Sequence, residues 1–149
     1  MKVTILGSGT STGVPEIGCT CEVCTSADPR DHGLRTSALV ETDDARILID
    51  CGPDFRAQVL GLPFKKIDGV LITHEHYDHV GGLDDLRPFC RFGEVPIYAE
   101  AYTAERLRNR MPYCFVNHNL HFCNDNAKIN KISVTWLVYL NFFSYFCRK

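Results

Sequence analysis

A cluster of metal-binding side chains follows the apolar run 70–72 and comprises His74, His76, Asp78 and His79. If the apolar run is a strand, its period of two places His74 and His76 on the same side, with Asp78 and His79 in the turn beyond. Imidazole nitrogens and carboxylate oxygens suit zinc or a similar divalent ion, and four ligands over so short a span favour two adjacent ions. Two ions about 4 Å apart can clamp the attacking and leaving oxygens of a hydrolytic displacement.

The alternative for the same segment is a polar surface turn, because charged turns are common in proteins. The composition of this segment favours the metal site over a surface turn. Three of the six histidines in the chain fall here, at the end of an apolar run, and Gly81 and Gly82 allow close backbone approach. We therefore favour a metal centre built by this segment.

A second group of potential ligands consists of Cys19, Cys21 and Cys24. Three thiolates this close can hold one zinc ion, and His32 is near enough in sequence to be a candidate for the fourth ligand. Disulfide pairing is the alternative, and it would leave one cysteine of the three unpaired. The N-terminus lacks a charged segment followed by an apolar core and a cleavage site, so we expect a cytoplasmic, reduced protein and favour zinc.

Composition limits the class of protein and its partners. The chain has 149 residues, 45% hydrophobic and 23% charged, which suits one domain with one core. A net charge of -2 gives no general polyanion-binding signal, so nucleic acid is not a favoured partner. The most apolar stretch, residues 132–146, is shorter than the ~20 residues of a membrane-spanning helix and is rich in strand formers. We expect a strand there and no membrane partner.

Polar and apolar alternation, turn residues and helix caps predict the elements that must position these groups. Strands are expected at residues 1–6, 35–41, 46–50, 67–72 and 96–99, and helices at 54–60, from Leu83 to near Pro88, and from a Thr103 cap to Arg110. A loop is expected at 111–115, with His118 and His121 after it as surface residues. Glycine-rich residues 7–13 do not fit the dinucleotide fingerprint, so a loop beside the active site and a plain turn both remain open.

Charged residues at the ends of these elements have alternative roles. Asp50 ends an apolar strand, where it is either an exposed strand terminus or the acceptor of the second ring proton of a metal-bound histidine. Arg106, Arg108 and Arg110 can meet a phosphate, although a solvated helix face is the favoured interpretation.

The pattern His-x-His-x-Asp-His resembles the motif of the metallo-β-lactamase superfamily. The resemblance implies an α/β fold, the αββα sandwich of two sheets between helices, of which this chain would form the first half as a mixed sheet with flanking helices. It implies that His74 and His76 bind the first ion and Asp78 and His79 the second. Asp78 would also be catalytic by orienting the attacking water, and Asp50 would support a ligand histidine. Zinc is favoured, and manganese or iron also suits such ligands.

Four segments resemble a narrower group, the cyclic phosphodiesterases of phosphonate breakdown: 7–15, the cysteine group, 48–53 and 73–86. In that group the three cysteines hold a structural zinc, and the reaction opens phosphoribosyl 1,2-cyclic phosphate. The resemblance thus implies a zinc-dependent hydrolase of a small phosphodiester. Endonucleases of transfer-RNA 3′ ends share the histidine motif and are an alternative, whereas the cysteine group argues against lactam or thioester hydrolysis.

The resemblance covers residues 1–119, and residues 120–149 form a divergent apolar tail that does not match the family. Family members continue with further ligands to both ions, and no motif here matches those ligands. A truncated, non-catalytic metal-binding remnant is therefore the second hypothesis. Half of a two-sheet sandwich would expose the face that meets the other half, so we also expect a homodimer.

Overall fold

The computed structural model describes residues 1–115 and 132–134. Within these ranges, no helix has the length and apolar character required to cross a membrane. The expected surface positions of His118 and His121, and most of the apolar tail, lie outside the described residues. The part of the tail that is described, Ile132–Val134, forms a short strand.

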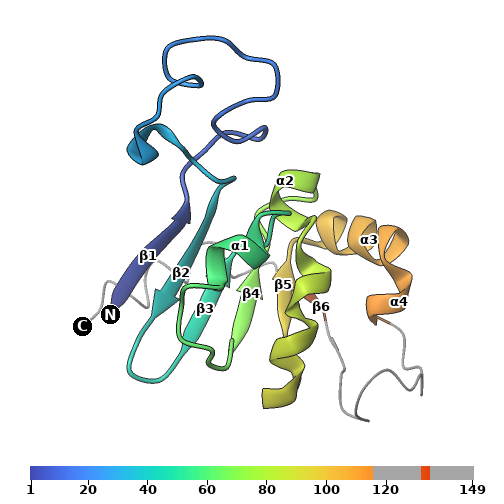
Figure 1. Ribbon diagram of the computed structural model, residues 1–149. Coiled ribbons are helices and arrows are strands. Elements are labelled where there is room, and N and C mark those ends of the chain that lie inside the picture. Colours follow the sequence, from blue (N-terminus) through green and yellow to red (C-terminus); the bar gives the residue numbers. More distant parts are fainter. Residues whose placement is uncertain (116–131, 135–149) are drawn as a thin grey trace.

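The described residues form one mixed sheet of six strands in the order β1-β2-β3-β4-β5-β6 (Figure 1). The first three strands pair antiparallel and the last three continue in parallel from β3. The strands are β1 (Lys2–Gly7), β2 (Ser37–Glu41), β3 (Arg46–Ile49), β4 (Gly69–Leu71), β5 (Ile97–Ala99) and β6 (Ile132–Val134). This arrangement confirms the predicted mixed sheet with flanking helices.

One face of the sheet carries the hydrophobic core. Leu39, Leu48, Val70 and Ile97 lie side by side in the strand register and are almost fully buried. Helical segments cover this row and contribute further buried apolar side chains, among them Phe55 (Figure 1). The segments are α1 (Phe55–Val59), α2 (Tyr77–Val80), the 3₁₀ helix η2 (Leu83–Phe92), α3 (Ala101–Arg110) and α4 (Pro112–Phe115).

Three local predictions were wrong. The helix from Leu83 passes through Pro88 as a 3₁₀ helix and ends at Phe92, because Phe89 and Cys90 pack into the core beyond the proline. Glu100 caps α3 instead of Thr103, since its carboxylate accepts the amides of the first turn while Thr103 is buried within the helix. The loop expected at 111–115 contains the short helix α4.

Between β1 and β2 the chain makes a long excursion that projects beyond the end of the sheet (Figure 1). Its one regular element is the short 3₁₀ helix η1 (Pro29–Asp31). Backbone hydrogen bonds close its base, from the Gly9 amide to the Leu34 carbonyl and from the Val14 amide to the Gly33 carbonyl, both 2.8 Å. After β1 the glycine-rich segment is an irregular connection with an isolated bridge from Gly9 to Arg35, and it leads into the cysteine group.

Candidate metal centre

The histidine cluster lies where two parallel strands end. β3 and β4 run in parallel, so their carboxyl ends meet at one edge of the sheet. Asp50 follows β3, and Thr73 and His74 follow β4. The Asp50 amide donates to the Leu71 carbonyl at 2.8 Å, which ties the two strand ends together.

Asp50 is a buried carboxylate in an unusual backbone conformation. Its φ of 56° lies in the left-handed region, which aspartate tolerates better than most residues, and the residue is 2% exposed. Its Oδ1 accepts the Thr73 amide at 2.8 Å, and its Oδ2 accepts the Thr73 hydroxyl at 2.8 Å. The same Oδ2 lies 2.7 Å from Nδ1 of His79. The sequence left two roles open for Asp50, and this geometry is that of a carboxylate that orients an imidazole.

The contact with Asp50 determines which nitrogen of His79 is available as a ligand. A carboxylate can only accept, so Nδ1 of His79 carries the proton and Nε2 presents a lone pair. That Nε2 lies 3.1 Å from Oδ2 of Asp78. Two acceptors this close repel unless a cation or a proton lies between them. The pair therefore fits a divalent cation, and its role as a ligand pair stays a prediction.

Thr73 orients a second imidazole, a role that the sequence analysis did not assign. Its hydroxyl gives its one proton to Asp50, so it can only accept from Nδ1 of His74, 3.0 Å away. Nε2 of His74 is then free to bind a metal. The His74 ring lies with its centroid 4.7 Å from that of His76 and 4.0 Å from that of His79. A hydroxyl residue directly before the histidine motif was the available sequence signal.

Glycines allow α2 to press its first turn against the loop after β3. The Cys51 amide donates to the His79 carbonyl at 2.7 Å, and the Gly82 amide donates to the Cys51 carbonyl at 2.9 Å. A Cβ at Gly52 would collide with the Asp78 carbonyl oxygen. Backbone packing of this kind holds Asp78 and His79 beside Asp50.

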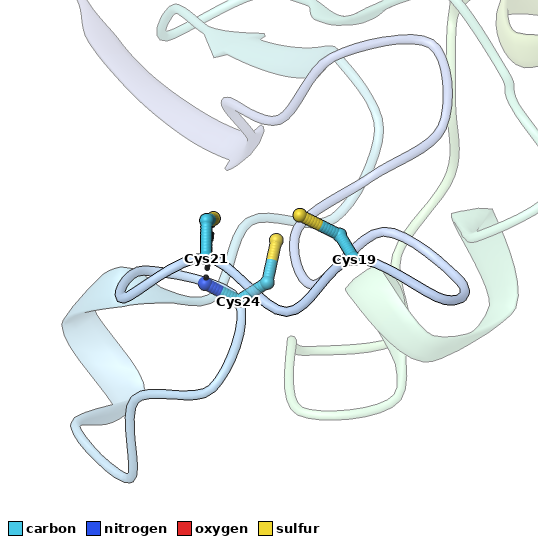
Figure 2. A group of neighbouring side chains, drawn as sticks. All are labelled: Cys19, Cys21 and Cys24. Atoms are coloured by element: carbon cyan, nitrogen blue, oxygen red, sulfur yellow. Dashed lines mark hydrogen bonds between the residues drawn. The ribbon is translucent and has the colours of Figure 1, made fainter.

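The cysteine group is brought together as predicted. The sulfur atoms of Cys19, Cys21 and Cys24 all lie within 4.8 Å of one another, and they are drawn in Figure 2. The described cysteines are free of disulfides. Hydrogen bonds from the Cys24 amide and from Cys19 lower the pKa of the Cys21 thiol, which favours the thiolate that zinc binds. The hydrogen bond from the Glu16 amide lowers the pKa of the Cys24 thiol, but Cys19, desolvation and Cys21 together outweigh it, so that this pKa is raised. This donor set fits one structural zinc ion, and its occupancy stays a prediction.

The structure does not bring His32 to the cysteine group. Its Nε2 lies 3.1 Å from the Ser26 carbonyl oxygen, and within residues 1–115 the group contains only the three thiols. Sequence proximity suggested His32 as a fourth ligand, but its ring follows η1 and bonds to the excursion's own backbone.

The cationic residues of α3, Arg106, Arg108 and Arg110, are all exposed, which agrees with the expected solvated helix face. The Arg106 guanidinium lies 4.9 Å from the centroid of the Tyr102 ring. Arg110 donates from Nη1 to the carbonyl oxygen of Glu75 at 3.0 Å, which links α3 to the histidine motif.

A mixed sheet covered by helices, with imidazole and carboxylate groups at the carboxyl ends of its parallel strands, offers ligands suited to divalent metal ions at that edge. Residues 45–138 match the family model described as a β-lactamase superfamily domain. The chain belongs to the metallo-β-lactamase superfamily. The matched range includes the histidine motif, and it extends past residue 119.

Three relatives illustrate the similarity. An octanoyltransferase of Porphyromonas gingivalis is 55% identical over 116 residues, which are 77% of this chain and 24% of that protein. The crystal structure of a diphosphatase from the PhnP family has 49% identity and a TM-score of 0.71, over 74% of this chain and 46% of that one. Zn²⁺-bound PqqB from Methylobacterium extorquens has 28% identity and a TM-score of 0.63, over 73% and 43%. The chain thus spans less than half the length of each of these relatives.

Proposed function

We propose that this chain carries the metal-binding part of a phosphodiester hydrolase that opens a small cyclic phosphodiester, with a phosphoribosyl cyclic phosphate as the favoured substrate. The observation that carries the proposal is the Asp50 and Thr73 network, which engages Nδ1 of both His79 and His74 and leaves Nε2 of His79 beside Asp78. The 49% identity to a diphosphatase of the PhnP family supports phosphorus chemistry. The cysteine group supports the same subgroup.

His74 and His76 would hold one ion of this centre, and Asp78 and His79 the other. Bound zinc ions would stabilise negative charge on the phosphoryl oxygens and make a water nucleophilic near neutral pH. Manganese or iron would suit the same donors. A third zinc would be structural, on the three thiols, and their reduced state is the reason to propose a cytoplasmic location.

The chain's own residues hold protons and orient groups. Asp50 keeps the proton of His79 on Nδ1, and Thr73 does the same for His74. Asp78, which is partly buried, offers a carboxylate oxygen that can accept a proton from the attacking water and so fix its direction. None of these steps requires movement of the strands.

Two alternatives to a phosphodiester hydrolase follow from a relative and from the ligand count. The octanoyltransferase match covers 24% of that protein, so its name does not decide the activity of this segment. A metal-binding role without turnover is the second candidate. It is favoured by the ligand count within residues 1–115, where each ion position receives only two of the predicted ligands.

The test is hydrolysis of bis(p-nitrophenyl) phosphate by the purified chain, with zinc or manganese added. We expect turnover in the wild type and a loss of at least about 100-fold in His76→Ala, since a ligand contributes more than the 10 to 100-fold of its supporting partners. His32→Ala is the matched control and should retain the wild-type rate. Absence of turnover in folded, metal-loaded protein would favour the role without turnover, and equal rates in His76→Ala would point to a contaminant.

A further inference from the structure

Arg110 is the last residue of α3, a helix that is firmly held at the edge of the core. Glu100 caps its first turn, and Thr103, Ala104 and Leu107 are buried beneath it. The helix follows directly on β5, the neighbour of the strand that leads into the histidine motif. The helix is therefore anchored at its start and along its buried side, and its carboxyl end is a fixed point.

The guanidinium of Arg110 reaches from this fixed point to the backbone between two predicted ligands. Its Nη1 donates to the Glu75 carbonyl oxygen at 3.0 Å, and Glu75 lies between His74 and His76. The flanking residues are held in other ways. The Thr73 amide donates to Asp50, and the His76 carbonyl accepts the amides of His79 and Val80.

No other hydrogen bond within the described part of the chain restrains the backbone of His74 or Glu75. His76 is exposed, and its ring meets the His74 ring edge-on. Among the described residues, Arg110 is thus the hydrogen-bond donor to the peptide segment that joins these two imidazoles.

We propose that Arg110 is a positioning residue of the metal centre, which fixes the backbone between His74 and His76 through the Glu75 carbonyl. The inference rests on the proposed metal role of these two histidines. A cationic side chain near a dication opposes metal binding by charge repulsion, so charge alone gives it no reason to be there. The two effects therefore differ in sign: loss of Arg110 tightens metal binding by charge and weakens it by lost positioning.

The first readout needs no metal. Backbone ¹⁵N order parameters of Glu75 and His76 should be near 0.85 in the metal-free wild type and fall below about 0.6 in Arg110→Gln. Arg110→Lys should keep the wild-type values, because its ammonium donates at nearly the reach of arginine, whereas the amide of the shorter glutamine in Arg110→Gln falls short of the Glu75 carbonyl oxygen. Arg106→Gln is the matched control, since its guanidinium interacts with the charge of Glu75 but makes no hydrogen bond to the Glu75 backbone. Wild-type order parameters in Arg110→Gln would overturn the proposal.

The second readout is the affinity for manganese(II), measured by titration calorimetry with His76→Ala to identify the site. Manganese is chosen because the three thiols are poor ligands for it. Arg110→Gln should bind about 10-fold more weakly, in the range of other changes that disturb ligand orientation, and Arg106→Gln equally or more tightly. Equal or tighter binding in Arg110→Gln would reject the positioning role. A wild type whose manganese binding matches His76→Ala would instead reject the proposed metal function, and the order parameters would still decide the role of Arg110.

Discussion

Asp50 connects the end of a strand to both predicted ion positions. The left-handed conformation of a non-glycine residue costs about 1–3 kcal/mol, and it persists where the surroundings fix it. Here the Ser37 hydroxyl donates to the Asp50 carbonyl at 2.9 Å, and the Thr73 amide, the Thr73 hydroxyl and His79 satisfy the carboxylate. Asparagine would fit the same backbone, but its amide group offers one oxygen in place of two. The position therefore requires a carboxylate, because Asp50 orients His79 directly and orients His74 through the Thr73 hydroxyl.

Cys114 gives a pH-dependent prediction. Burial and then the negative charge of Asp84 raise the pKa of its thiol to about 11. At pH 8 the thiolate fraction is then about 0.1%, far below that of an ordinary cysteine, so alkylation by iodoacetamide should be slow and should rise about tenfold per pH unit. The neutral thiol is favoured by folding, so the free energy of unfolding should fall as the pH rises from the ordinary thiol pKa towards 11.

Mass spectrometry of the Cys114 peptide measures this labelling rate. Asp84→Asn removes the nearby charge, should lower the pKa and should speed the reaction at pH 8. Labelling of Cys114 in folded protein at the rate of the denatured chain would contradict the expected shift.

At the same scale, the sequence predicted the candidate ligands, which remain a prediction, and only one of the residues that support them. Closely spaced histidines and an aspartate after an apolar strand predicted the cluster. The supporting role of Asp50 was one of two roles that the sequence left open for this residue. Thr73 and Arg110 were assigned no such role, because their contacts join residues 23 and 35 positions apart. Such contacts depend on the strand order and on where α3 ends. Neither the strand order nor the end of α3 can be predicted from a local sequence pattern.

Elements meet at the metal centre through backbone contacts that only glycine permits. The loop after β3 and the end of α2 approach so closely that a Cβ at Gly82 would collide with the Gly52 carbonyl oxygen. The φ of Gly82 is −99°, which any residue adopts, so a substitution there tests this packing and not backbone freedom.

Gly82→Ala should lower the free energy of unfolding by about 3 kcal/mol, the upper range for overpacking a buried contact. Urea denaturation followed by circular dichroism measures the change. Gly61→Ala is the matched control, since no atom lies within 4 Å of its added Cβ, and it should stay within about 0.5 kcal/mol of the wild type. Equal stability of the two variants would mean that the loop and α2 can separate without cost.

The strands and most helices were predictable because each carries its own pattern. Apolar alternation gave β1, the β2–β3 hairpin and β5, and the apolar run before the histidines gave β4. The course of η2 was not predictable, because Pro88 is a stop signal that burial of Phe89 and Cys90 overrides. The predicted cap of α3 was three residues too late. The residue preferences of helix caps favoured Thr103, whereas the Glu100 carboxylate accepts the amides of Tyr102 and Thr103.

At the scale of the whole molecule, the sheet has a second apolar face. Ile5, Ala38, Ile49, Leu71 and Tyr98 lie side by side in the register, on the face opposite the helices. At the β1 end of this face, Ile5 is 64% exposed and Val3 is 53% exposed. A sheet that is apolar on both faces needs cover on both, which is the physical basis for the expected homodimer.

The expected self-association is measured by light scattering over a range of concentrations. The wild type should exceed the monomer mass of 16.8 kDa, and the double variant Val3→Lys with Ile5→Lys should return to it, because two ammonium groups cannot be buried in an apolar contact. Ala57→Lys, on the exposed side of α1, is the control and should associate like the wild type. A wild type that stays monomeric, or a double variant that associates equally, would show that this face does not bind a second copy.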